Sequence, residues 1–159
     1  MKNINQWLDA YGESHQNKTN KKIHWICIPL IILSLLGMLS LIKFSVRISN
    51  NALFCINFAH LLIFLAILFY LRLSISITIG MFIISSICLF FIYQFELLFY
   101  SNKQLFFIYL SIFIGSWIGQ FIGHKIEGKK PSFFEDLQFL LIGPAWLLSF
   151  IYKKIGIKY

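Results

Sequence analysis

The chain has 159 residues, enough for one domain, and 58% of them are hydrophobic while only 13% are charged. Soluble domains are about 45–50% apolar, and here the charges cluster between long apolar runs, so the composition predicts an integral membrane protein. The net charge of +8 does not indicate nucleic-acid binding, because the basic residues flank apolar runs, where phospholipid headgroups lie, and no stretch interleaves basic with aromatic residues.

Residues 1–24 form a mostly polar segment that we expect at the membrane interface. Within it, residues 3–16 have the pattern of a short amphipathic helix. Trp7, Tyr11 and His15 follow one another at every fourth position and form a stripe suited to rest on the membrane surface.

A break in the helix is expected within residues 17–20, where Asn17, Thr19 and Asn20 suit a helix end followed by a new N-cap. His15 and His24 are nine residues apart, which places them about 180° apart on one continuous helix. The two histidines can therefore share a site only if the chain breaks between them.

Five apolar segments follow, and they predict an all-α bundle of four to five transmembrane helices in a single domain, residues 1–159. The predicted spans are residues 25–42, 52–71, 73–92, 105–123 and 137–152. The fourth contains Gly115 and Gly119, spaced to let another helix approach closely. The fifth has sixteen residues and includes Gly143-Pro144, which is compatible with a kinked span or a re-entrant segment.

The number of crossings places the two histidine-bearing ends together. Four spans separate His24 from His124, so both ends lie on the same side of the membrane, however residues 137–152 are arranged. His15, His24, His124 and Glu127 can therefore meet in one interfacial site. The side with the histidines has eight basic residues against six on the other, which favours a cytoplasmic site.

Both parts of this candidate site place an imidazole beside other polar groups. Asn20 and His24 are four residues apart, and Gln120, His124 and Glu127 share a helix face at i, i+4 and i+7. Such groups suit a metal ion whose ligands are supported by neighbouring hydrogen bonds. They equally suit polar span ends that face headgroups and water, and the residue pattern leaves both interpretations open.

His60 is the fourth histidine, and it lies near the middle of the predicted second span with Asn57 three residues before it. At that depth it is a poor partner for an interfacial metal, so we interpret it as a structural hydrogen-bonding residue. The sequence has no G-x-S-x-G, P-loop or G-x-G-x-x-G motif.

Two sequence blocks, taken together, resemble a known family. The first block is Ser14-His-Gln-Asn-Lys-Thr-Asn-Lys-Lys-Ile-His24, followed by Ile28-Pro29. The second is Trp117-Ile-Gly-Gln-Phe-Ile-Gly-His124, followed by Glu127, Lys129, Pro131 and Asp136-Leu137. In order and spacing they are similar to the Mpo-like family of membrane proteins, whose characterised members are iron(II)-dependent 2-hydroxy fatty acid dioxygenases.

The resemblance implies a set of functional residues in this chain. The implied Fe²⁺ ligands are His15, His24 and His124. Glu127 is implied to be catalytic, either as a ligand or as an orienting group. Hydrogen-bond support is expected from Tyr11, Asn17, Asn20 and Gln120. The substrate carboxylate is expected to pair with Lys21, Lys22 or Lys125.

The implied substrates are a long-chain 2-hydroxy fatty acid and O₂, and the implied reaction is a step of fatty-acid alpha-oxidation that removes one carbon as CO₂. The composition places the protein in a membrane, and we expect this to be the bacterial inner membrane, or the endoplasmic reticulum membrane in a eukaryote. Membrane lipid is an expected partner, and a homo-oligomer is left open. The alternative is a non-catalytic membrane protein that binds lipid or acts as a helix scaffold.

Overall fold

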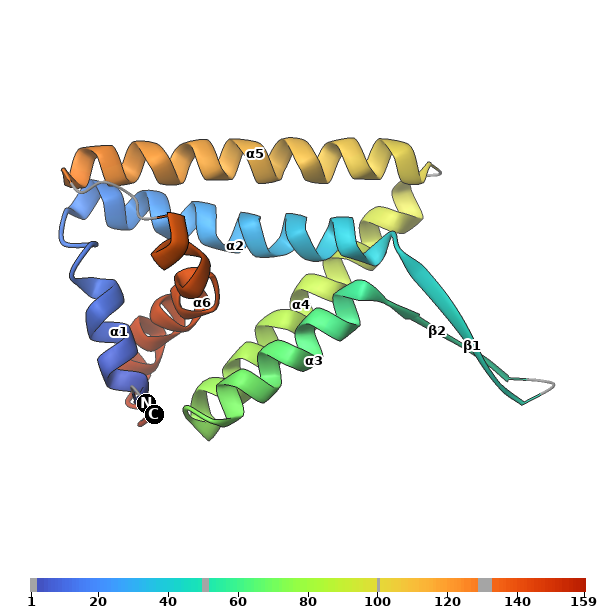
Figure 1. The fold of residues 1–159 in the computed structure, drawn as a ribbon, viewed down its shortest axis with the longest axis horizontal. Coiled ribbons are helices and arrows are strands. Elements are labelled where there is room, and N and C mark those ends of the chain that lie inside the picture. Colours follow the sequence, from blue (N-terminus) through green and yellow to red (C-terminus); the bar gives the residue numbers. More distant parts are fainter. Residues whose placement is uncertain (1–2, 50–51, 100, 129–132) are drawn as a thin grey trace.

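A computed structural model describes residues 3–49, 52–99, 101–128 and 133–159, with the backbone alone for 45–49, 52–55 and 133–138. These residues form helices joined by one β-hairpin (Figure 1). The elements in chain order are α1 (Ile4–Gly12), α2 (Lys18–Ser40), β1 (Lys43–Ser49), β2 (Ala52–Asn57), α3 (Phe58–Leu71), α4 (Ile75–Leu98), α5 (Asn102–Glu127) and α6 (Phe133–Ile155).

Helices α2 and α5 lie side by side and antiparallel along the length of the molecule (Figure 1). Glycines on α5 allow this close approach: a Cβ at Gly119 would lie 2.6 Å from Cys27 Sγ, and one at Gly123 would overlap Asn20 Oδ1. Gly115 faces open space, so the small residues that contact α2 are Gly119 and Gly123 rather than the predicted pair of Gly115 and Gly119. The antiparallel arrangement brings the beginning of α2 beside the end of α5.

Helices α3 and α4 form a second antiparallel pair that crosses beneath α2, and α6 lies between this pair and α1 (Figure 1). Two buried tyrosines fasten α6 to the pair. The Tyr70 hydroxyl of α3 donates to the Leu141 carbonyl at 2.6 Å, and the Tyr152 hydroxyl of α6 donates to the Ser76 carbonyl at 2.7 Å. The middle and the C-terminal part of α6 are therefore bonded to α3 and to the beginning of α4.

Three of the described helices, α2, α4 and α5, are long and apolar enough to cross a membrane. Helix α3 is also apolar but has only 14 residues, a length of about 21 Å against a hydrocarbon core of about 30 Å. By length and composition the described helices thus include three candidate spans, and the predicted count of four to five is not confirmed.

The prediction that residues 52–71 form one helix is wrong in its first six residues. Ala52–Asn57 is strand β2, which pairs antiparallel with β1. Residues of β1 alternate polar and apolar side chains in the sequence, a period of two that is typical of a strand. Asn57 then caps α3, because its side chain accepts from the His60 backbone N–H at 3.2 Å, so the helix begins at Phe58.

His60 therefore lies in the first turn of α3, exposed, and not in the middle of a span. Its Nδ1 lies 2.7 Å from Asn57 Oδ1 and completes the cap of the helix. The Phe58 N–H donates to the Ile42 carbonyl, which places the beginning of α3 beside the end of α2. His60 thus has a structural role, at the opposite end of α2 from His24.

We expect single cysteines at the two ends of α5 to react from opposite sides of the membrane. Lys103 and Lys125 are separated by 22 residues of α5, about 33 Å, and Lys18 begins the neighbouring α2. In a variant without the native cysteines, a membrane-impermeant thiol reagent should label positions 18 and 125 from one side and position 103 from the other. Labelling of positions 18 and 125 from opposite sides would contradict the antiparallel arrangement across a membrane.

Candidate metal centre

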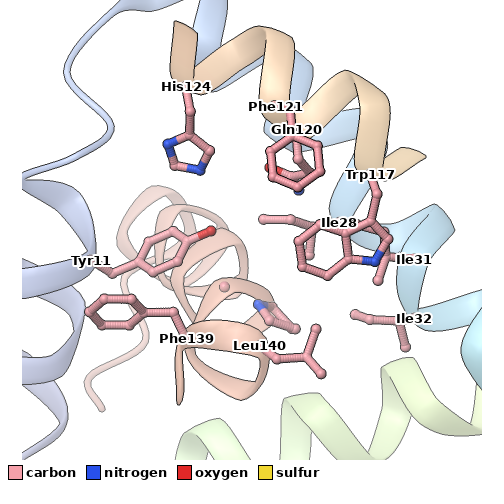
Figure 2. Close-up of a pocket in the computed structure, with 12 residues that line it drawn as sticks. Tyr11, Ile28, Ile31, Ile32, Trp117, Gln120, Phe121, His124, Phe139 and Leu140 are labelled. Atoms are coloured by element: carbon pink, nitrogen blue, oxygen red, sulfur yellow. The ribbon is translucent and has the colours of Figure 1, made fainter. Parts of the chain in front are cut away.

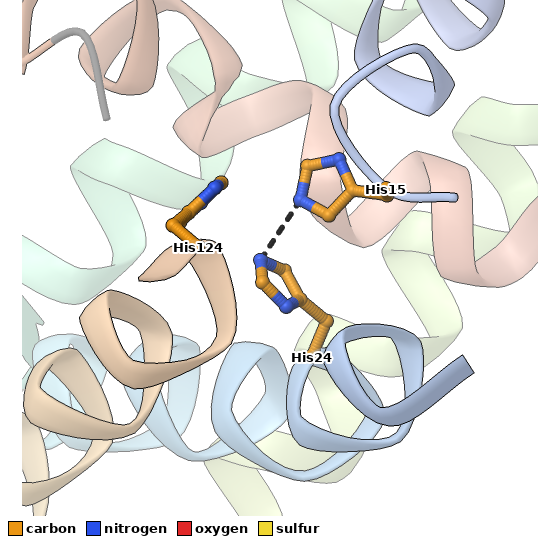
Figure 3. Close-up of side chains that lie close together, drawn as sticks. All are labelled: His15, His24 and His124. Carbon is orange, nitrogen blue, oxygen red and sulfur yellow. Dashed lines mark hydrogen bonds between the residues drawn. The ribbon is translucent and has the colours of Figure 1, made fainter. Parts of the chain in front are cut away.

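Three histidines from distant parts of the sequence converge at one end of the α2–α5 pair (Figure 3). His15 lies in the linker between α1 and α2, His24 on α2, and His124 near the end of α5. One ring nitrogen of each lies within 4.8 Å of the others. Their exposed fractions are 2%, 0% and 8%, so the cluster is closed off from bulk solvent.

The linker that positions His15 lies between the end of α1 and the N-cap of α2. Helix α1 ends at Gly12, and the Asn17 side chain accepts from the backbone N–H of Thr19 at 2.8 Å, which starts α2 at Lys18. The break lies at residues 13–17, earlier than the predicted stretch of residues 17–20, because Asn17 caps α2 and Lys18–Asn20 already belong to this helix. It allows His15 to turn back toward His24.

Hydrogen bonds to carbonyl groups determine which nitrogen of two of the imidazoles has the proton. His15 Nδ1 donates to the Tyr11 carbonyl at 2.6 Å, and His24 Nδ1 donates to the Asn20 carbonyl at 3.0 Å. Because a carbonyl oxygen only accepts, both Nδ1 atoms are protonated, and each neutral ring has its lone pair on Nε2. Both of these lone pairs point into the cluster.

The two Nε2 atoms lie 2.9 Å apart and face each other (Figure 3). Burial lowers the pKa of His15 to about 4, so this ring is neutral at neutral pH. Two facing lone pairs repel, and one added proton would place a charge in a buried site. A metal cation satisfies both nitrogens, because cis ligands at about 2.1 Å from one ion lie about 3 Å apart.

Aromatic residues hold the His15 ring in place. Tyr11 stacks on it with ring centroids 4.2 Å apart and planes within 10°, and Trp146 of α6 lies 5.3 Å from it. Tyr11 and His15 are buried in the protein, so the prediction that this stripe rests on the membrane surface is wrong for both residues. The stripe packs on α6 instead, where Phe139 and Trp146 both contact Tyr11.

Glu127 lies outside the three-histidine group and binds the linker. Its carboxylate accepts from the backbone N–H groups of Gln16 at 2.7 Å and Asn17 at 2.9 Å, and from Asn20 Nδ2 at 2.9 Å. These bonds connect the end of α5 to the segment that contains His15. The carboxylate is therefore placed to position two of the histidines relative to the third.

Gly123 is a site residue that the sequence interpretation missed. Asn20 is fully buried, and its Oδ1 packs against Gly123 with no hydrogen-bond partner among the described residues. Any larger residue at this position would displace Asn20, which both accepts from His24 and donates to Glu127. The signal is present in the sequence, because glycine recurs at every fourth position, 115, 119 and 123, up to His124.

A cavity of about 50 Å³ opens beside His124 (Figure 2). Tyr11, Gln120 and Trp117 border it, and apolar residues of α2 and α6 complete its walls. The predicted carboxylate partners lie elsewhere: Lys21 is half-buried, Lys22 and Lys125 are exposed, and none is among the described residues that line this cavity.

The fold and site define a helical protein with three helices long enough to cross a membrane and a buried cluster of three histidines at one end. The chain belongs to the Mpo1-like family, described as 2-hydroxy-palmitic acid dioxygenase Mpo1-like, which matches residues 1–155. This confirms the resemblance found in the two sequence blocks, and the family name implies a dioxygenase of a 2-hydroxy fatty acid. No curated protein and no solved structure matches the chain.

Proposed function

We propose that this protein is an integral membrane dioxygenase that binds Fe²⁺ through His15, His24 and His124 and shortens 2-hydroxy fatty acids by one carbon. The observation that supports it best is the buried pair of facing Nε2 atoms, with a nitrogen of His124 within 4.8 Å. The reaction balances without a further reductant, since the hydroxy acid and O₂ yield the shortened acid, CO₂ and water.

Bound iron(II) would supply open coordination positions for O₂ and for the hydroxyl and carboxylate of the substrate. The protein's own residues prepare the site for these groups. The imidazole ligands are neutral, so they would not cancel the positive charge of the bound ion. That charge would then attract an anionic substrate. Tyr11 and Gln120 border the cavity next to His124, where they can form hydrogen bonds with the substrate head.

Residues outside the cavity hold the ligands and attract the substrate. Glu127 binds the linker and so keeps His15 in reach of His124. Lys21, Lys22 and Lys125 lie on the same end of the α2–α5 pair, where their charges would attract a carboxylate before it enters. In this proposal the histidine end lies at the cytoplasmic interface of a membrane, with the acyl chain among the helices.

The proposal is tested with carboxyl-labelled 2-hydroxypalmitic acid. Only an acid with oxygen on both C1 and C2 can chelate a metal in a five-membered ring, so purified protein with Fe²⁺ and O₂ should release the label as CO₂. Unsubstituted and 3-hydroxy acids of equal length should be left nearly untouched. Removing O₂ or chelating the metal should stop turnover. Label that stays in the lipid would instead favour the non-catalytic lipid-binding alternative.

A further inference from the structure

A second cavity, of about 100 Å³, lies deeper in the bundle between α2, α3, α4 and α6. Ile31, Ile32, Leu140 and Pro144 line both this cavity and the one beside His124, so the two adjoin. If the polar head of a molecule lay at the histidines, its tail could extend into the second cavity, toward the end of α2 that is far from His24.

The second cavity is suited to an apolar ligand. Its described lining is hydrophobic except for Tyr70 and Ser85, and the Tyr70 hydroxyl is already bonded to the Leu141 carbonyl at 2.6 Å. No charged group is among the described residues that line it. Its volume admits a segment of a hydrocarbon chain rather than a whole long chain.

The direction of the cavity follows α2. The residues of α2 that line it extend to Leu36, twelve residues beyond His24, about 18 Å along the helix. The path therefore leads from the polar histidine end into the apolar middle of the bundle. An amphiphile suits this path, because its polar head can lie at the histidine end and its unbranched tail in the apolar cavity.

We propose that the second cavity binds the part of the acyl tail that follows the head of the substrate, and that Ser85 leaves the space for it. This inference rests on the proposed function, because it takes the head to be at the histidines. Ser85 and the larger Met81 are the described residues of α4 that line the cavity, whereas the next residue, Ser86, is exposed and is not among the lining residues. Each buried methylene strengthens binding about fourfold, so acids too short to reach the cavity bind weakly.

The test compares Ser85→Phe with Ser86→Phe, a matched control that adds the same ring outside the cavity. With 2-hydroxypalmitic acid, Ser85→Phe should raise KM at least tenfold, while 2-hydroxyhexanoic acid, which is too short to reach the cavity, should show unchanged kinetics. Ser86→Phe should match the unmodified protein with both acids. Equal effects of the two variants, or equal effects on both acids, would overturn the inference. If Ser85→Phe fails to fold, Ala66→Leu on the cavity side of α3 provides the same test.

A second measurement is independent of turnover. A 2-hydroxy acid with a photoreactive diazirine in its chain should cross-link to cavity residues of α3 or α4, and excess unlabelled 2-hydroxypalmitic acid should prevent this. Ser85→Phe should reduce the cross-link and Ser86→Phe should not. A protein that forms the displaceable cross-link but turns over no acid would refute the proposed dioxygenase while supporting the tail site. A protein that turns over the acid without this cross-link would refute the tail site alone.

Discussion

Replacing His24 with alanine should abolish the proposed iron binding and lower the proposed 2-hydroxy acid turnover by more than about 100-fold, because loss of a neighbour that merely supports a metal ligand already costs 10–100-fold. His24 is fully buried, and its Nε2 lies 2.9 Å from that of His15. Its removal leaves the remaining two imidazoles as an incomplete ligand set. His15→Ala and His124→Ala should have the same effect, measured as iron per chain after purification in detergent.

His60→Ala is the matched control for these variants. His60 caps α3 at the opposite end of α2, so its loss should lower thermal stability slightly and leave iron content unchanged. Circular dichroism should show that all four variants keep their helices. Full iron content in the three site variants would refute the ligand set.

Gly123→Ala should be strongly damaging for a single added methyl group at the histidine end of the α2–α5 interface. The added Cβ would overlap Asn20 Oδ1, and Asn20 is fully buried and held by Glu127, so it has little room to move. We expect the free energy of unfolding to fall by about 1–3 kcal/mol. Turnover should fall by about 10–100-fold, because Asn20 supports His24 through its carbonyl.

Gly115→Ala is the control on the same helix. A Cβ at Gly115 meets nothing within 4 Å, so alanine should keep activity and raise helix stability by up to about 1 kcal/mol. Thermal unfolding and turnover of both variants give the comparison. If Gly123→Ala behaved like Gly115→Ala, the close contact of α5 with Asn20 would not constrain the site.

The convergence of the histidines could be predicted from the sequence because it depends on few assumptions. Antiparallel packing of α2 and α5 brings His24 and His124 together, and a break before α2 brings His15 back to them, whereas the even number of membrane crossings stays a prediction. The histidines meet although one predicted span is partly wrong, because the hairpin returns the chain to the end of α2, and the antiparallel pair α3–α4 then leads it back to the beginning of α5 near that end. The chain path, and not the exact length of each helix, determines which ends meet.

Other features depend on contacts that no local pattern specifies. The apolar stretch before His60 is compatible with both a helix and a strand by composition, and hydropathy alone could not reveal β2. The burial of Tyr11 requires Phe139 and Trp146, residues more than a hundred positions later. Likewise the spacing of Gln120, His124 and Glu127 indicated a common helix face but not that Glu127 binds the backbone of the linker.

The separation of the ligands along the chain has a consequence for how the protein is held together. His24 and His124 are 100 residues apart, so an ion bound by both closes a loop that contains the hairpin, α3 and α4. Closing a long loop removes more conformational entropy from the unfolded chain than closing a short one, although the gain grows slowly with length. The same ion would therefore hold the beginning of α2 to the end of α5, and this link cannot form until α5 has been synthesised.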